Sequence, residues 1–250
     1  MMPVALFATS ACYTERMNAL LEQVDNVAVA ASTLLHQVAS ASIAARGRAV
    51  IVLSGGSTPL AMYRHIVANY AQADFWQHCL FFWGDERFVP LLHPDSNAGA
   101  AIKALLEPLH IHNYQPWPHD GLSPEQAADN YAQIVLETLQ CSPDDHEATL
   151  FDLVFLGLGD DAHTASLFPD TDAVLASGFS TVVRPAGKGT RLSLTAHTLS
   201  RAREVAFLVS GENKREALHA TLQEARDITR YPAQAISARE RTRYLSDIAL

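Results

Sequence analysis

The sequence contains few cysteines, fewer basic than acidic residues, and no tract rich in Gly, Pro and Ser. Its three cysteines, Cys12, Cys79 and Cys141, lack the spacing of metal ligands. Their scarcity argues against a disulfide-rich scaffold and predicts a reducing, cytoplasmic location. Lys and Arg number 18 against 27 Asp and Glu, which gives a net charge of −9. Because nucleic-acid binding depends on a basic surface, we expect no nucleic-acid partner.

Segments that would anchor or divide the chain are also missing. No basic residue precedes the apolar residues at the start of the sequence, and no stretch reaches membrane-spanning length. We therefore expect no membrane partner. Hydrophobic residues make up 48% of the chain, and no linker interrupts it. The sequence thus predicts that residues 1–250 form a single domain around one substantial core.

Short apolar segments alternate with longer helical patterns, which predicts an α/β fold. Strands are expected at 4–8, 48–53, 80–83, 152–158, near 182 and 192, at 205–209 and, at a sheet edge, at 242–248. Helices are expected at 15–45, from 59, from 97, at 123–139 after a capping box, after Thr195 and at 212–224. Right-handed crossovers between such strands imply a mainly parallel sheet with helices on both faces.

A Gly-rich turn follows the apolar strand at 48–53. Its glycines allow a tight turn and a close backbone approach to a ligand, and the next proline suits the first position of a helix. Either of the two hydroxyl residues between them can cap that helix. Free N–H groups at a helix N-terminus favour an anion, above all phosphate. An ordinary capped corner has the same pattern. The candidate phosphate-binding residues are Ser54, Gly55, Gly56, Ser57 and Thr58.

Charged residues follow the next apolar strand. Arg87 can form a forked pair with a phosphate or with a developing oxyanion. Asp85 and Glu86 can hold Arg87 in place or contact sugar hydroxyls, and Ser96 or Asn97 can cap the following helix. The alternative is a surface cluster of charges, which contributes little. The position of the cluster at a strand end favours a role in a binding site.

The most informative stretch is a buried-strand pattern that ends in a turn with two carboxylates and a histidine. This turn brings Asp160, Asp161 and His163 to one place. Residues past the carboxyl end of such a strand line the crevice where α/β proteins bind ligands. A carboxylate two positions before a histidine can orient the ring and stabilise its charged form. The pattern therefore predicts His163 as a general base, oriented by Asp161.

The same turn also matches a dinucleotide-binding fingerprint. Gly157, Gly159 and Ala162 occupy the Gly-x-Gly-x-x-Ala positions after a strand. Two carboxylates at the turn would repel a pyrophosphate, however, and Pro169 shortens the helix that the fingerprint needs. Motifs for a nucleophile elbow, a P-loop or a zinc-protease helix do not occur. We expect no organic cofactor and no metal.

The three loops resemble the signature blocks of the 6-phosphogluconolactonase family. The matching blocks are Ser54–Pro59, Asp85–Pro90 with His93–Asn97, Gly157–Pro169, Arg191–Thr195 and Gly211–Lys214. The related glucosamine-6-phosphate deaminases share the diglycine loop, but their histidine is followed by Ile-Ala-Phe-Asn-Glu. In this chain His163 is followed by Thr-Ala-Ser-Leu-Phe. The resemblance implies a Rossmann-like sheet, the fold of sugar-phosphate isomerases and deaminases.

The resemblance also implies an activity, the hydrolysis of 6-phospho-D-glucono-1,5-lactone in the pentose phosphate pathway. His163 would take a proton from the attacking water while Asp161 orients its ring, and Arg87 would lie beside the phosphate loop. Lys188 and Arg191, in a Gly-rich segment, would close over the substrate. A solvated loop lysine and an arginine that supports a helix end are the alternatives. The expected partner is the sugar-phosphate lactone alone, with the chain a monomer or weak homo-oligomer.

One departure from the family pattern lies in the histidine turn. Ala162 stands where the family has glycine. If the backbone φ at this position is positive, alanine costs on the order of 1 kcal/mol relative to glycine. This departure bears on the level of activity and not on the family.

Two other functions share this fold. A deaminase or isomerase needs a further acid–base carboxylate after the histidine turn, where this chain has Ser166-Leu-Phe-Pro169. A non-catalytic sugar-phosphate sensor, as in transcription regulators, needs a DNA-binding helix-turn-helix, and the chain has no spare basic segment for one.

Overall fold

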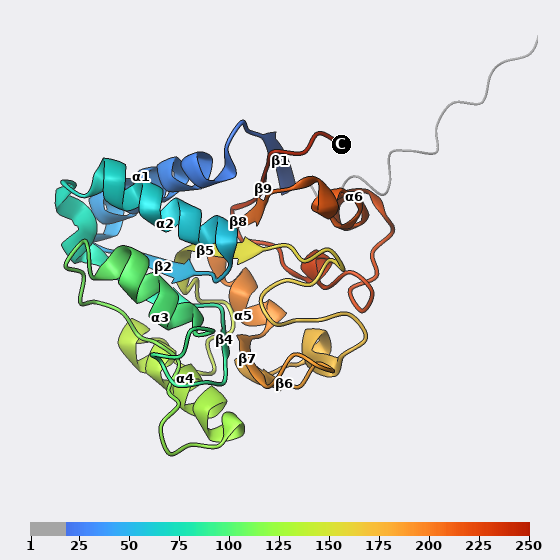
Figure 1. The fold of residues 1–250 in the computed structure, drawn as a ribbon. Coiled ribbons are helices and arrows are strands. Elements are labelled where there is room, and N and C mark those ends of the chain that lie inside the picture. The colour runs from blue at the N-terminus through green and yellow to red at the C-terminus, as the bar shows by residue number, and fades with distance from the viewer. Residues whose placement is uncertain (1–18) are drawn as a thin grey trace, which may run out of the picture.

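The structure is a computed structural model that describes residues 19–250 (Figure 1). Six strands form a parallel sheet in the order β1-β9-β8-β5-β2-β3. In chain order they are β1 (Ala19–Gln23), β2 (Ala49–Leu53), β3 (Cys79–Trp83), β5 (Phe151–Gly157), β8 (Ala202–Val209) and β9 (Arg241–Ser246). The predicted α/β fold with a mainly parallel sheet is confirmed. The strand predicted at 4–8 lies outside the described residues, as does Cys12.

A second, antiparallel sheet continues from the end of β3. Its order is β4-β7-β6, with β4 (Asp85–Arg87), β6 (Ser180–Val183) and β7 (Arg191–Leu194). Gly84 joins the two sheets, because its N–H donates to Leu53 O at 3.2 Å and its carbonyl accepts from Leu194 N at 2.8 Å. Strand β4 was not predicted, since three consecutive charged residues carry no strand signal and only the pairing with β7 makes them extended.

Helices cover both faces of the parallel sheet (Figure 1). On one side α1 (Val27–Arg46) and α2 (Ser57–Tyr70) pack together. On the other side lie α4 (Pro124–Leu139), which packs on the small sheet, and α5 (Ala196–Ser200), which packs on β8. The remaining helical segments are α3 (Asn97–Ala101) with a π-helical turn at Ile102–Leu106, α6 (Arg215–Gln223), and 3-10 turns at Asp74–His78, Asp172–Leu175, Glu212–Lys214 and Pro232–Ala235.

Three helices begin at the predicted caps. The Ser96 hydroxyl accepts from Gly99 N at 2.9 Å at the start of α3. Ser123 and Gln126 form the predicted capping box of α4, and Thr195 caps α5. These short-range signals are reliable because a cap satisfies backbone N–H groups that have no partner within the helix.

The N-terminal part of the described chain differs from the prediction. A helix was expected over 15–45, but residues 19–23 form strand β1, and α1 begins only after its cap Asn26. The segment Ala-Leu-Leu-Glu-Gln favours helix by propensity, and parallel pairing with β9 outweighs that preference. Because β1 occupies the sheet edge, β9 is an interior strand and not the predicted edge strand.

Helix α1 is, within residues 19–250, the one helix long and apolar enough to cross a membrane by length and composition. The expectation that no stretch reaches that length was therefore wrong. Its apolar side contacts α2 and strands β2, β5, β8 and β9, and 44% of the apolar window is buried. The apolar composition thus serves to cover the core of the fold.

Strands β2 and β5 are buried along both faces, which explains their continuous apolar sequences. Asp152 is the exception within β5. Its carboxylate accepts a hydrogen bond from Val50 N at 2.8 Å. It also forms ion pairs with Arg46 at 2.6 Å and with Arg203 at 3.5 Å. A buried carboxylate is tolerated here because several donors replace its lost hydration.

We predict that Asp152→Ala lowers the free energy of unfolding by about 3 kcal/mol, because it removes the acceptor of Val50 N–H and the buried carboxylate that Arg46 and Arg203 share. The matched control is Glu240→Ala, which removes an exposed partner of Arg203 and should cost at most about 1 kcal/mol. Urea denaturation of both variants measures the difference. Equal losses would show that Asp152 has no special structural role.

Candidate active site

The three predicted loops meet at the carboxyl ends of neighbouring strands β5, β2 and β3. They line a cavity of about 290 Å³. Of the predicted site residues, the cavity wall contains Ser54, Gly55, Gly56, Ser57, Thr58, Arg87 and His163. Strands that end at one edge of a parallel sheet bring distant loops together, and this geometry creates the site.

The phosphate loop differs in one detail from the prediction. The N-cap of α2 is Gly56, with φ of 106°, and no side chain caps the helix. The predicted cap at Ser57 or Thr58 was wrong because both residues already lie inside the first helical turn, where Pro59 is the third residue. Their hydroxyls and the N–H groups of this turn therefore remain near the cavity, where an anion is favoured.

Tyr63, from α2, holds the start of this loop. Its hydroxyl donates to Ser54 O at 2.6 Å and accepts from Ser54 N at 3.2 Å. Burial raises the pKa of Tyr63, so the hydroxyl stays protonated and keeps both hydrogen bonds. Because the Ser54 N–H is used in this way, the loop donors for an anion begin at Gly55.

His163 and Asp161 form the predicted pair. The Asp161 Oδ1 lies 2.5 Å from His163 Nδ1 and accepts from His163 N at 3.0 Å. With Nδ1 held by the carboxylate, Nε2 is the ring nitrogen available to a reactant. The ring also packs on Phe168, with centroids 4.5 Å apart. The turn itself is closed by Gly159 N, which donates to His163 O at 2.8 Å.

The Asp161 carboxylate is held in its charged form. Partial burial acts to raise its pKa, but the hydrogen bonds from His163 and the charges of His163 and Lys188 outweigh burial and lower the pKa below its ordinary value. An ionised carboxylate beside Nδ1 stabilises an imidazolium, which is the state of a base that has taken a proton.

The charged loop after β3 is organised differently from the expectation. Glu86 does not hold the Arg87 side chain; its buried carboxylate accepts from the N–H groups of Arg87, Asn97 and Ala98 and from Ser96 Oγ, at 2.7 to 3.0 Å. Burial raises the pKa of Glu86, and these donors oppose the rise. Arg87 Nη1 instead donates to Asp95 O at 2.7 Å. Glu86 therefore fixes the loop that presents Arg87 and Asn97.

Asp85 contributes a carboxylate to the cavity wall. Its Oδ2 accepts from Ser166 Oγ at 2.6 Å, so the segment after the histidine turn contacts the loop after β3. Burial raises the pKa of Asp85, while the Ser166 hydrogen bond and the nearby charges of Arg87, His163 and Arg191 oppose that rise. The sequence alone did not indicate Ser166 as a partner, because the two residues are 81 positions apart.

Three predicted residues do not line the cavity: Asp161, which binds His163, and Arg191 and Lys188. Arg191 lies directly opposite Arg87 in the β4–β7 pairing, and burial together with the Arg87 charge lowers its pKa. Lys188 Nζ lies 4.5 Å from the centre of the Phe168 ring, which also packs on His163. Two adjacent guanidinium groups are electrostatically unfavourable alone and are relieved by an anion between or beside them.

The cavity wall includes residues to which the sequence assigned no role. Ser210 and Lys214 line it from the segment after β8, and Asn97 was considered only as a helix cap. The strand-end rule that selected the other loops also applies to β8, the neighbour of β5 in the sheet, so it would have indicated Ser210 and Lys214.

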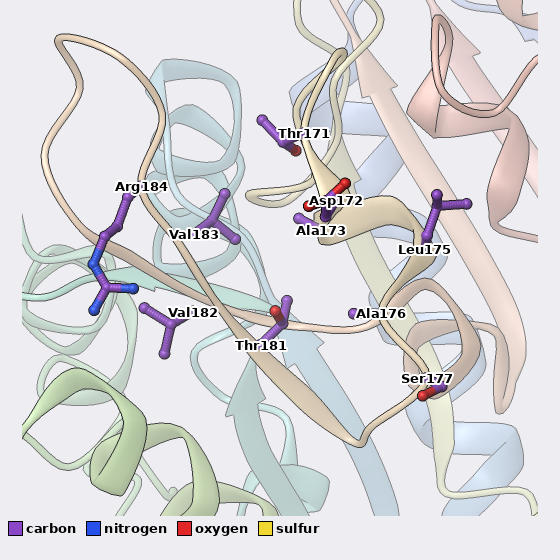
Figure 2. A pocket seen from close by; sticks show the side chains of 10 residues that line it. All are labelled: Thr171, Asp172, Ala173, Leu175, Ala176, Ser177, Thr181, Val182, Val183 and Arg184. Atoms are coloured by element: carbon purple, nitrogen blue, oxygen red, sulfur yellow. The ribbon is translucent and has the colours of Figure 1, made fainter.

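Figure 2 shows a different hollow, between the 3-10 turn at Asp172–Leu175 and strand β6. Its only ionisable lining residues are Asp172 and Arg184, and their side chains lie apart in this view. Arg184 pairs with Glu125 at 2.5 Å. This hollow has no histidine and no Gly-rich loop, so it lacks the groups that the cavity at the strand ends brings together.

The dinucleotide fingerprint is not supported by the local structure. Residues 158–171, after β5, contain no helix, whereas the fingerprint requires a helix N-terminus at the pyrophosphate. Within residues 19–250, no group of three or more His, Cys, Asp and Glu side chains is arranged to hold a metal ion.

Comparison with known proteins gives the family. The family model for glucosamine-6-phosphate isomerases/6-phosphogluconolactonase matches residues 22–245. The chain belongs to this family. A 6-phosphogluconolactonase of Synechocystis is 39% identical over 208 residues, which cover 82% of this chain and 85% of the relative. A 6-phosphogluconolactonase of Mycobacterium tuberculosis is 35% identical over 232 residues, 89% of this chain and 92% of the relative.

Solved structures of the family share the fold. The crystal structure of 6-phosphogluconolactonase from Thermotoga maritima has a TM-score of 0.79 at 25% identity, covering 91% of this chain and 99% of that one. A monomeric glucosamine-6-phosphate deaminase has a TM-score of 0.75 at 17% identity, covering 92% and 97%, and shows a common fold alone. The predicted family and the prediction of an enzyme of the 6-phosphogluconolactonase type are confirmed.

The turn that carries His163 contains the positive φ anticipated for the family glycine. Ala162 has φ of 62°, and its methyl group is buried. We predict that Ala162→Gly raises the free energy of unfolding by about 0.5 kcal/mol. Glycine removes the strain of an alanine with a left-handed backbone, and this gain exceeds the cost of the greater conformational entropy that glycine gives the unfolded chain. Ala31→Gly, at a buried position inside α1, is the control and should lower it by about 1 kcal/mol. A lower free energy of unfolding for Ala162→Gly would contradict the prediction that the Ala162 backbone is strained.

Proposed function

We propose that this chain hydrolyses 6-phospho-D-glucono-1,5-lactone to 6-phosphogluconate. The observation that carries the proposal is the shared cavity of His163 and the diglycine loop at residues 54–58. A base and an anion site on one wall suit a substrate with a reactive ester at one end and a phosphate at the other. The relatives that are 32–39% identical to this chain bear the name 6-phosphogluconolactonase.

The phosphate would bind at the N-terminus of α2. N–H groups from Gly55 to Thr58 and the hydroxyls of Ser57 and Thr58 supply donors, and the 14-residue helix adds its positive end. Arg87 lies on the same wall, and Arg191 lies beside it on β7. Because the whole chain is acidic, these local cations supply the attraction for a dianion.

The reaction requires a proton acceptor and then a proton donor. His163 Nε2 takes a proton from water as the water oxygen bonds to C1 of the lactone. The π electrons of the C1 carbonyl move to the carbonyl oxygen, which becomes an oxyanion. When the tetrahedral intermediate collapses, the bond from C1 to the ring oxygen breaks and the imidazolium protonates that oxygen. Asp161 keeps the ring oriented and stabilises its charge throughout. A strained lactone is an activated ester, so the step needs no covalent nucleophile.

A second candidate is sugar-phosphate isomerisation or deamination. The observation in its favour is Asp85, a carboxyl group on the cavity wall with a raised pKa, which suits proton transfer at carbon. Its main obstacle is the Ser166 hydrogen bond, which occupies one Asp85 oxygen. Freshly prepared lactone, assayed for acid release above the spontaneous rate, tests the first function. Ammonia release from glucosamine 6-phosphate tests the second.

We also propose a reducing cytoplasmic setting for this activity. The two cysteines in the described part of the chain, Cys79 and Cys141, are unpaired, and Cys79 is buried.

We predict that His163→Ala lowers kcat for the lactone by at least about 10²-fold, because general base catalysis typically contributes 10²–10⁴-fold. Binding of 6-phosphogluconate should change little, since the phosphate loop is untouched. His119→Ala is a close control: His119 also pairs with a carboxylate, at 3.2 Å, and packs on a phenylalanine, but it is not on the cavity wall. Full lactone turnover by His163→Ala would exclude the proposed base.

We further predict that Gly159→Ala lowers kcat/KM by about 10²-fold. A methyl group on Gly159 would overlap His163 Nδ1 and Asp161 Oδ1, so the pair must move, and small displacements of catalytic groups have effects of this size. Gly157→Ala adds the same methyl two positions earlier, where it meets nothing within 4 Å, and should cost far less. Equal effects of the two variants would argue against a precise His163–Asp161 geometry.

A further inference from the structure

The carbonyl oxygen of the Asn97 side chain has no hydrogen-bond donor among the described residues. Asn97 is 4% exposed, and its Oδ1 is buried on the wall of the active-site cavity. Buried polar atoms of native proteins nearly always have a partner, so an orphaned acceptor at a binding cavity calls for a ligand donor.

The orientation of this amide follows from its neighbours. Asn97 Nδ2 donates to Asp85 O at 3.1 Å and lies 3.4 Å from Asp85 Oδ1. A flipped amide would place its oxygen against two acceptors, which is repulsive, so the nitrogen must face Asp85. The Asn97 backbone is equally fixed, because its N–H donates to the buried Glu86 carboxylate at 2.7 Å.

Oδ1 therefore points toward the diglycine loop. A Cβ atom built on Gly55 would overlap Asn97 Oδ1 directly, so glycine is required at that position for the loop to approach the amide. The oxygen thus lies next to the proposed phosphate site, although a phosphate dianion offers only acceptor oxygens and would be repelled by it. A hydroxyl group can donate to it.

We propose that Asn97 is a specificity-determining residue whose Oδ1 accepts a hydrogen bond from one ring hydroxyl of the sugar-phosphate lactone. This inference rests on the proposed function and adds the feature of the substrate that the site selects. Asp85, the neighbouring wall residue, supplies a further acceptor oxygen, Oδ1, so this part of the wall suits a polyhydroxylated chain. The adjacent loop at Gly55–Thr58 supplies donors to the phosphate.

The test uses the unmodified lactone and its three analogues that lack the hydroxyl at carbon 2, 3 or 4. For the wild-type enzyme, one analogue should lose about tenfold or more in kcat/KM, because a site built for a hydroxyl penalises its absence. Asn97→Ala should lower kcat/KM for the unmodified lactone by a similar factor. For that one analogue, Asn97→Ala and the wild-type enzyme should have the same kcat/KM, because the hydrogen bond is already absent.

A purely structural role gives a different pattern. If Asn97 only held the loops in place, Asn97→Ala would lower kcat/KM for all four compounds by one factor, and the inference would be wrong. Wild-type turnover that is equal for the three analogues would overturn it without any variant, even if Asn97→Ala did not fold. Absence of wild-type turnover of the unmodified lactone would instead contradict the proposed function.

Asn113→Ala is the matched control. Its amide also bridges two chain segments, donating to Gln77 O at 3.0 Å, but it is exposed and is not on the cavity wall. This variant should leave the ranking of the four compounds unchanged. A change in the ranking for Asn113→Ala would show that the preference does not come from the Asn97 oxygen.

Discussion

The burial of the parallel sheet on both faces constrains where chemistry can occur in this protein. Within β2 and β5 an ionisable side chain needs several partners, as Asp152 has in Arg46, Arg203 and the backbone. Polar groups therefore gather past the strand ends, where loops leave the sheet and backbone groups can face a ligand. Four neighbouring strands, β8, β5, β2 and β3, end beside one cavity, and the site depends on this alignment.

The cavity is divided by hydrogen-bonding character. Donors come from the diglycine loop and Arg87, whereas Asp85 and the Asn97 carbonyl are acceptors. Buried Glu86 connects the two sides, because the same carboxylate fixes the backbone of Arg87 and of Asn97. In the proposed function, the phosphate of the substrate lies at the donors and its hydroxyls lie at the acceptors. In that proposal the lactone carbon faces His163.

The local features of the fold were largely predictable from the sequence. The strands at β2, β3 and β5, the capping box at Ser123 and the turn at His163 are encoded within a few residues. Predictions failed where distant pairing decided the outcome. Residues 19–23 favour helix but pair with β9, and β4 exists only because β7 lies beside it. The cap of α2 was misplaced because a glycine with positive φ is its N-cap, one or two residues before the predicted caps.

The sequence by itself determined the groups available: a Gly-rich loop before a helix, a histidine two positions after a carboxylate, and an arginine at a strand end. Short-range backbone physics is sufficient for these features, since each lies within one turn or one strand end. Only the tertiary structure decided which groups meet, such as Ser166 with Asp85, Arg191 with Arg87, and Asn97 with Gly55. These contacts join segments far apart in the chain, and their geometry follows from sheet order and register, which local propensity does not contain.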